Sequence, residues 1–354
     1  MLGAFGPSVL VFLVAAGAVW ISGIRLSDAT DVLSERFGLG QALGGLLLLA
    51  ITTNLPEIAI VVSAAMSGDL GIAIGNILGG IAIQTVVLVA LDVFGVRGSA
   101  PLTYQAASLV LVLEGTLVVA VLVVAIMGSQ LPPSIIFERL APGGVLIAAL
   151  WVAGVLLLAR ARAGLPWQER GVAPGGQEEP RGVARTKKEG HARRKGFSNT
   201  RVISVFALAS VVTLAAGVAL EQSGEAIAGR IGMSGVLFGS TVLAAATALP
   251  EVSTGLASVR LRDYQLAVSD IFGGNAFLPV LFLVASLISG QAVLPQLRST
   301  DIYLTGLGIL LTTVYVWGIV LRPRRQILGM GVDSLVVLIL YLFGMAGLVA
   351  VARG

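Results

Sequence analysis

Residues 45–84 read GLLLLAITTNLPEIAIVVSAAMSGDLGIAIGNILGGIAIQ, and residues 239–278 read GSTVLAAATALPEVSTGLASVRLRDYQLAVSDIFGGNAFL. A shift of 194 positions aligns the two segments, and 13 of the 40 aligned positions are then identical. A hydrophobic chain supplies some apolar matches by chance. It does not readily place Thr-x-Leu-Pro-Glu at the same point of both segments. The chain therefore contains an internal repeat, with Thr53 and Glu57 in one copy and Thr247 and Glu251 in the other.

The composition indicates that the solvent of this chain is a lipid bilayer. Of its 354 residues, 56% are hydrophobic and 12% are charged, whereas soluble domains carry about 25% charged residues. The mean hydropathy is +0.95. The chain has no cysteine and a single histidine, His191, which excludes disulfides, thiolate metal sites and catalysis by cysteine or a histidine triad.

The apolar residues fall into stretches long enough to cross a membrane, which takes roughly 20 residues per helix. We expect an all-α integral membrane protein of about ten transmembrane helices, arranged as two five-helix repeats of inverted topology. The ten stretches are residues 7–24, 38–66, 70–93, 104–128, 141–160, 200–220, 234–258, 264–289, 300–321 and 329–352.

A basic segment separates the two repeats. Residues 161–199 show no apolar periodicity and are predicted to be a disordered linker between repeats at residues 1–160 and 200–354. Residues 160–201 hold 11 of the 23 basic residues, so the positive-inside rule places the linker in the cytoplasm. Ten crossings then put 19 of the 23 basic residues inside and both termini outside. We interpret the linker as a topology determinant and tether; binding to anionic lipid or regulation is the alternative.

The repeats must be inserted in opposite orientations, because five helices per repeat is an odd number. Inverted repeats are typical of secondary transporters, whose binding site lies near the bilayer midplane where the repeats meet. The architecture favours alternating access and a transporter rather than an enzyme.

The two Leu-Pro-Glu steps predict a binding site in the membrane. Pro56 and Pro250 each remove a helix hydrogen bond and free a backbone carbonyl. Glu57 and Glu251 follow directly, and a charged residue at mid-membrane costs about 2.5–3.5 kcal/mol. We expect these glutamates to meet across the pseudo-two-fold axis and share one cation. The alternative is that both are protonated and form hydrogen bonds between helices.

The expected ligands suit a calcium ion. Two carboxylates match the charge of one divalent cation, and carboxylate, hydroxyl and carbonyl oxygens are the donors that Ca²⁺ favours. Thr53 and Thr247, one helical turn before the glutamates, add hydroxyls and carbonyls. Without the divalent ion the two carboxylates repel and would accept Na⁺ or protons, and this competition is a physical basis for antiport.

At these residues the chain resembles the calcium:cation antiporter superfamily, which includes the sodium/calcium exchangers. Its two repeats read approximately G-T-S-L-P-E and then G-N-x-x-G-S-N-x-x-N. Here the corresponding segments are ITTNLPE with GNILGGIAIQ, and AATALPE with SDIFGGNAFL. The resemblance implies a divergent, prokaryote-like member in a bacterial or archaeal plasma membrane, with Glu57 and Glu251 as the central calcium ligands and Thr53 and Thr247 as further ligands.

The resemblance also implies which neighbours take part and where this chain departs from the family. Asn54 stands at the family serine before Leu-Pro-Glu, Gln84 keeps the final polar position of the first repeat, and Asn275 keeps the family asparagine. The departures are Ala248, Gly80, Gly274 and Leu278, which lack the polar groups of the family. We therefore expect the flanking sodium sites to be depleted, and the choice between Na⁺ and H⁺ stays open.

Other acids lie in apolar segments. Asp270 stands opposite Asn76 in the repeat alignment and is either a solvated or capping acid near a membrane end or a replacement acid in the ion path. Glu114 has no acidic counterpart and is either a proton relay or ligand or a structural hydrogen-bond partner. Asp92 and Asp333 fall near cytoplasmic helix ends, where we expect them to be solvated.

The leading hypothesis is a secondary cation antiporter that exports Ca²⁺ in exchange for Na⁺ or H⁺. Passive cation channels are an alternative, although the sequence has no ring of acids or filter-like repeat. A carrier for another divalent cation, such as Mn²⁺ or Mg²⁺, and an intramembrane hydrolase with two carboxylates are further alternatives. We expect no cofactor besides the transported ions, and as partners only the lipid bilayer and metal cations, not nucleic acid. The oligomeric state stays open.

Overall fold

The computed structural model describes residues 5–36, 51–96, 100–163, 198–260 and 262–353. Apart from a β-hairpin whose two strands have two residues each and an isolated bridge, the elements of this part are helices. The first repeat contains α1 (Phe5–Arg36), α3 (Leu55–Ser67), α4 (Leu70–Ala90), a π-helical turn η2 (Leu91–Gly95), α5 (Leu102–Ala106), α6 (Leu109–Ser129) and α7 (Pro142–Ala163).

The second repeat follows the same order. It contains α9 (Asn199–Ile231), α10 (Gly235–Phe238), η3 (Gly239–Leu243), α11 (Ala244–Thr247), α12 (Leu249–Arg260), α13 (Tyr264–Phe277), η4 (Leu278–Val280), α14 (Leu281–Ser289), η5 (Leu294–Gln296), α15 (Ser299–Leu321), β1 (Gln326–Ile327), β2 (Met330–Gly331) and α16 (Val332–Arg353).

The predicted membrane-spanning architecture is confirmed. In the described ranges, eight helices are long and apolar enough to cross a bilayer, and there are nine if the bent pair Gly235–Thr247 and Leu249–Arg260 is counted as one span. The remaining predicted stretch, residues 38–66, begins outside the described residues, and its second part forms α3. Large apolar side chains such as Leu10, Leu208 and Phe343 are exposed, as expected where a helix faces lipid.

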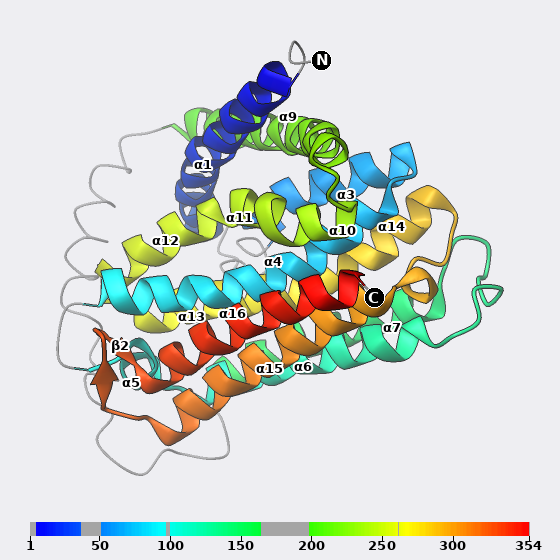
Figure 1. Ribbon diagram of the computed structural model, residues 1–354. Helices are drawn as coiled ribbons and strands as arrows, with labels where there is room; N and C mark the ends of the chain where they lie inside the picture. The colour runs from blue at the N-terminus through cyan, green and yellow to red at the C-terminus, as the bar shows by residue number, and fades with distance from the viewer. Residues whose placement is uncertain (1–4, 37–50, 97–99, 164–197, 261, 354) are drawn as a thin grey trace.

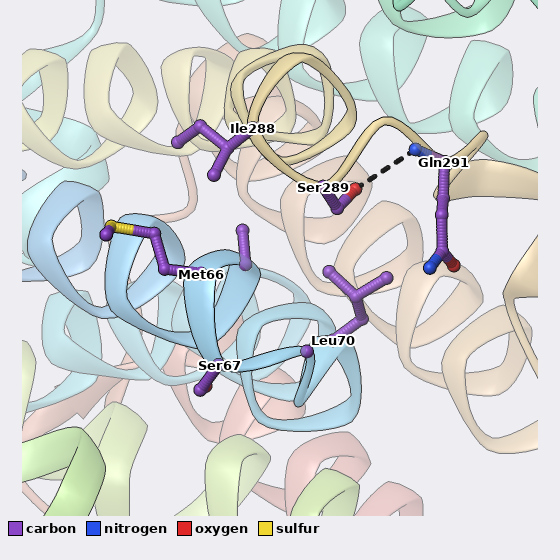
Figure 2. Close-up of a pocket in the computed structure, with 8 residues that line it drawn as sticks. Met66, Ser67, Leu70, Ile288, Ser289 and Gln291 are labelled. Carbon is purple, nitrogen blue, oxygen red and sulfur yellow. Dashed lines mark hydrogen bonds between the residues drawn. The ribbon is translucent and has the colours of Figure 1, made fainter.

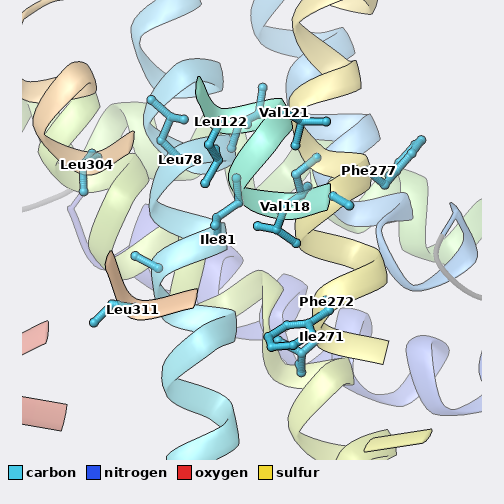
Figure 3. Packing of buried hydrophobic residues seen from close by; sticks show 14 of the residues in the cluster. Leu78, Ile81, Val118, Val121, Leu122, Ile271, Phe272, Phe277, Leu304 and Leu311 are labelled. Atoms are coloured by element: carbon cyan, nitrogen blue, oxygen red, sulfur yellow. The ribbon is translucent and has the colours of Figure 1, made fainter. Parts of the chain in front are cut away.

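The helices form two groups (Figure 1). Helices α1 and α9 lie against each other on one side of the molecule. Their most extensive contacts with the rest are with α3 and α12, the two helices that begin at Leu-Pro-Glu. In the second group, α4 and α13 pack against each other, α13 also packs against α6, and α4 also packs against α15. The centre of this second group is a continuous apolar core that includes Ile81, Val118 and Phe272 (Figure 3).

Each Leu-Pro-Glu step breaks its helix. Asn54 interrupts the helical conformation ahead of α3, and Ala248 does so between α11 and α12. The second break bends the span by 41°. Proline has no amide hydrogen and favours the first turn of a new helix, so the sequence sets both breaks. The glutamates consequently lie in the first turn of α3 and α12.

The duplication also preserves the start of the following helix. Asp69 accepts a hydrogen bond from the backbone amide of Ile72 and caps α4, and Asp263 accepts one from the amide of Leu266 and caps α13. Side-chain caps of this kind satisfy amides that the first turn leaves free. Both caps come from an aspartate that is identical in the two repeats.

Gly79, the first glycine of the pair in α4, serves close helix packing. A Cβ on Gly79 would lie 2.6 Å from both the Cβ and the carbonyl oxygen of Ser240, so α4 and η3 touch backbone to backbone at this point. Small residues allow such an approach. Gly273, the equivalent position of α13, has no atom of the described residues within 4 Å of where its Cβ would stand.

Candidate cation-binding site

Both repeat glutamates are buried. The Glu57 side chain is 0% exposed and that of Glu251 is 1% exposed. They are close enough that the charge of Glu57 acts on Glu251. Neither forms an ion pair with a basic residue in the described ranges. A buried carboxylate without a counter-charge is costly, so this pair calls for a positive charge that the described side chains do not provide.

The oxygen atoms around the pair point to the same conclusion. Within the described part of the chain, neither oxygen of Glu57 accepts a hydrogen bond, and the same holds for Oε2 of Glu251, Oε1 of Gln84 and Oδ1 of Asn275. All four side chains are buried. Buried acceptors normally have donors. A group of acceptors that lacks donors is what a cation site consists of.

The two repeats contribute to each other's glutamate. The Thr247 hydroxyl lies beside Glu57 and within hydrogen-bond distance of the Ala244 carbonyl oxygen, at 3.2 Å. A hydroxyl oxygen has lone pairs that a metal can use. In the reverse direction, Nε2 of Gln84 lies 3.5 Å from Oε1 of Glu251.

Two amides of the first repeat lie against the second. The place where a Gly274 Cβ would stand is 3.1 Å from Nδ2 of Asn54 and 3.3 Å from Oε1 of Gln84. The corresponding place at Gly80 is 3.4 Å from a methyl group of Leu278. The flank at Gly274 is therefore polar and the flank at Gly80 is apolar.

The remaining predicted ligands are buried but take different positions. Asn275 donates from Nδ2 to the Thr85 hydroxyl at 3.1 Å and to the Ile81 carbonyl at 3.4 Å. This fixes the amide across the two repeats and leaves its oxygen free of donors. Thr53 is also buried, directly before the break at Asn54. Thr85 is a contact that the sequence did not indicate.

Asp270 is neither solvated nor a helix cap, so the first of the two interpretations given for it is wrong. The side chain is 7% exposed, and Asp263 caps the helix instead. The Thr254 hydroxyl donates to Oδ2 of Asp270 at 2.9 Å. The charge of Asp270 also acts on Glu251, so a third acid lies along the same line of buried oxygens.

Glu114 is held in an ion pair. Its Oε1 lies 2.7 Å from Nη2 of Arg162, and the same nitrogen donates to the Ser269 hydroxyl at 2.9 Å. The sequence placed Arg162 in the linker, but α7 continues to Ala163 and brings the guanidinium to α6 and α13. This arrangement matches a structural role for Glu114.

Asp92 and Asp333 are buried, at 1% and 6% exposure, so the expectation that they are solvated is wrong. Asp92 accepts hydrogen bonds from the amides of Leu102 and Gly331 and from the Ser334 hydroxyl. It therefore ties η2 to α5 and to the β-hairpin. A short loop that folds back over a helix end buries an acid that hydropathy alone places in water.

A surface pocket between the α3–α4 turn and α14 is a different feature (Figure 2). It is lined by Met66, Ser67, Leu70, Ile288, Ser289 and Gln291, with Ala65 and Gly68. It contains no acid and is not a candidate for cation binding. Over the described residues, no group of three or more acids or histidines is compact enough to hold a metal. The candidate site consists of two carboxylates and neutral oxygens.

The fold defines a membrane protein built from two inverted repeats, each of which contributes one buried glutamate to the centre. The family of sodium/calcium exchanger proteins matches residues 7–160 and 201–347. The chain belongs to this family and is a cation antiporter of the membrane.

Individual relatives agree with this assignment. Inner membrane protein YrbG of Escherichia coli (strain K12) is 25% identical over 308 residues, which cover 86% of this chain and 87% of that protein. Native YfkE has a TM-score of 0.63 at 16% identity and covers 97% of this chain and 92% of its own. The H⁺/Ca²⁺ exchanger CAX has a TM-score of 0.63 at 14% identity, with coverage of 97% and 82%. The sodium-calcium exchanger NCX_Mj, soaked with Na⁺ and Sr²⁺, has a TM-score of 0.58 at 15% identity, with coverage of 96% and 97%. The likeness to these structures shows the fold.

Proposed function

We propose that this protein exchanges Ca²⁺ for Na⁺ or H⁺ by alternating access, with the ion bound between Glu57 and Glu251. The observation that carries the proposal is a pair of buried carboxylates, one from each repeat, without a basic partner in the described ranges. The exchangers CAX and NCX_Mj, which share the fold, are described as H⁺/Ca²⁺ and sodium-calcium exchangers.

Charge balance explains the preference for a divalent ion. Two carboxylates neutralise one Ca²⁺, and the neutral oxygens of Thr247, Gln84 and Asn275 complete an irregular shell of the six to eight oxygens that Ca²⁺ takes. Neutral ligands around two acids also keep the net charge of the filled site near zero. A neutral filled site can be enclosed in low-dielectric protein at small cost.

Competition explains the coupling. When Ca²⁺ leaves, two like charges remain in a buried site, and this state is unfavourable. Sodium ions or protons restore neutrality and allow the site to be enclosed again. Because an ion-bound site is less costly to enclose than an empty one, the protein changes between its outward-open and inward-open conformations mainly when an ion is bound. When ions are bound during the change in both directions, the result is exchange.

The test is ion flux in proteoliposomes that contain the purified protein. Vesicles loaded with ⁴⁵Ca²⁺ should release it when an inward Na⁺ or H⁺ gradient is imposed, and release should stop when the gradient is removed. Separate Na⁺ and pH gradients identify the coupling ion. Mn²⁺ and Mg²⁺ as competitors measure selectivity among divalent cations.

The matched control is the double variant E57Q/E251Q, which keeps the size of both side chains and removes both charges. It should fold and carry no Ca²⁺. Gradient-independent Ca²⁺ flux through the wild type would indicate a channel, and gradient-driven flux through the double variant would place the site elsewhere. Either result overturns the proposal.

A further inference from the structure

A further buried carboxylate lies where α9 packs against α3, the helix that carries Glu57. Glu221 of α9 is 1% exposed. Its Oε2 accepts a hydrogen bond from the Ser63 hydroxyl of α3 at 2.9 Å. Its Oε1 has no hydrogen-bond partner in the described part of the chain, and Glu221 forms no ion pair there. We call Glu221 and Ser63 the outer carboxylate site.

The packing of α9 on α3 places this site close to the glutamate pair. One turn before Glu221, a Cβ on Gly217 would lie 2.7 Å from the Cβ of Ala59 and 2.9 Å from the Pro56 carbonyl oxygen. Pro56 directly precedes Glu57. Ser63 is six residues further along α3, which is about 9 Å at 1.5 Å per residue. The outer carboxylate site therefore lies on the same helix as Glu57, toward the end of α3 at Ser67.

Other acids lead from the surface to this point. The charges of Glu225 and Asp69 act on Glu221. Glu225 is exposed and Asp69 is half-buried. The one basic residue of the last turns of α9 is Arg230, which is also exposed. The local charge is negative, and the acids are more buried the further they lie from the surface. Such an arrangement concentrates cations and speeds their binding.

The outer carboxylate site has no equivalent at the repeat-related positions. Position 194 residues before Glu221 carries Ser27, and position 194 residues after Ser63 carries Ala257. The duplication therefore did not produce it. Because the basic linker precedes α9 and is predicted to be cytoplasmic, this end of α9 and α3 faces the outside in the predicted orientation.

We infer that the outer carboxylate site binds a divalent cation transiently on its way between the outside and the glutamate pair. This inference rests on the proposed function. A carboxylate with a hydroxyl that belongs to no group of three or more acids or histidines in the described residues holds a divalent ion too weakly to trap it. A weak site suits an intermediate position, since conduction requires that each site release its ion.

A purely structural role makes the opposite prediction for two variants. If Glu221 only joined α9 to α3, then S63A would remove the hydrogen bond and impair Ca²⁺ exchange. E221Q would retain an acceptor for Ser63 and leave exchange unchanged. If Glu221 binds cations, E221Q removes the charge and is harmful, whereas S63A keeps it and is mild.

The experiment measures ⁴⁵Ca²⁺ exchange against unlabelled Ca²⁺ in sidedness-sorted proteoliposomes, with orientation checked by proteolysis of the linker. E221Q should raise the Ca²⁺ concentration for half-maximal exchange at least fivefold at the outer face and less than twofold at the cytoplasmic face. S63A should change both values less than twofold. E138Q, which alters an exposed acid of another loop, is the matched control and should leave both values unchanged.

Every outcome decides the inference. An unchanged outer value in E221Q, an equal change at both faces, or a larger effect of S63A overturns the outer carboxylate site while the proposed function stands. A wild type without Ca²⁺ exchange overturns both. If E221Q does not fold, E225Q, at an exposed position, must raise the outer value about twofold by lowering the same local potential, and no change there overturns the inference.

Discussion

The two glycines that follow the glutamates, Gly80 in the first repeat and Gly274 in the second, have different neighbours. Around Gly274 lie the amides of Asn54 and Gln84. Around Gly80 lies Leu278, and the equivalent of Asn54 is Ala248. The duplicated chain thus keeps its glutamates symmetric and makes their surroundings asymmetric.

This difference separates two requirements. If a divalent ion binds at the centre, as we propose, it needs one carboxylate from each repeat, so neither glutamate is free to change. A flank holds at most an additional ion or a hydrogen-bond network, and each flank can change by itself. In the described residues, the neighbour of a Gly80 Cβ is a methyl group of Leu278, which offers no oxygen to a second cation, so we expect monovalent ions to use the Gly274 flank.

The largest effect should come from testing the symmetric part. E57Q and E251Q, made singly, should each lower Ca²⁺ exchange at least about 100-fold, equivalent to about 2.7 kcal/mol, because one carboxylate cannot neutralise a divalent ion in a buried site. The measurement is ⁴⁵Ca²⁺ exchange at equal protein density. Either variant that retains a tenth of wild-type exchange would show that the two glutamates are not equivalent.

The next effect concerns packing. G79A should lower the stability of the protein by about 1–3 kcal/mol, the usual range for overpacking, because the new Cβ meets the backbone of η3 at Ser240. The matched control is G273A, whose Cβ has free space and which should be neutral or slightly stabilising through its higher helix propensity. Thermal unfolding in detergent compares them. Equal melting temperatures for the two variants would contradict the close contact between α4 and η3.

A third effect tests the polar flank itself. Q84L makes the first repeat resemble the second at this position and should raise the Ca²⁺ concentration for half-maximal exchange about tenfold, which corresponds to about 1.4 kcal/mol. The cause is loss of one neutral oxygen and of the amide that approaches Glu251. The counterpart variant L278Q adds an amide at Gly80. It should restore neither the neutral oxygen nor the amide near Glu251 that Q84L removes. Similar values for Q84L and the wild type would mean that Gln84 does not contact the ion.

The smallest effect concerns the acid that the first repeat lacks. D270N makes the second repeat match Asn76, keeps an acceptor for the Thr254 hydroxyl, and should change the half-maximal Ca²⁺ concentration only about threefold, or about 0.7 kcal/mol. The reason is that we expect Asp270 to act on Glu251 through its charge and not as a ligand of the ion. The control N76D introduces an acid at the equivalent position of the first repeat. Loss of exchange in D270N comparable to that of E251Q would make Asp270 a ligand.

Sequence patterns predicted the helical fold because the bilayer imposes simple rules. Apolar length sets the spans, and the prolines set the breaks at Asn54 and Ala248. The repeated Thr-x-Leu-Pro-Glu indicated both buried glutamates. These features depend on residues close together in the chain, and a local rule can read them.

Contacts between distant segments could not be predicted in the same way. Arg162 was assigned to the linker, yet it reaches Glu114 and Ser269 because α7 extends beyond its apolar stretch. Asp92 was expected in water, yet a returning hairpin covers it. Glu221 gave no signal, since an acid near a helix end usually lies in solvent, and only the packing of α9 on α3 buries it.

The amino-acid order alone determined that the protein lies in a membrane, that it consists of two opposed copies of one unit, and that each copy carries an acid after a proline. Hydropathy and proline chemistry act over a few residues, so they need no knowledge of the rest of the chain. Tertiary structure decided which oxygens surround those acids, which flank is polar and which remote acids are buried. These properties depend on how closely two backbones approach, and that distance is fixed only when helices far apart in sequence pack together.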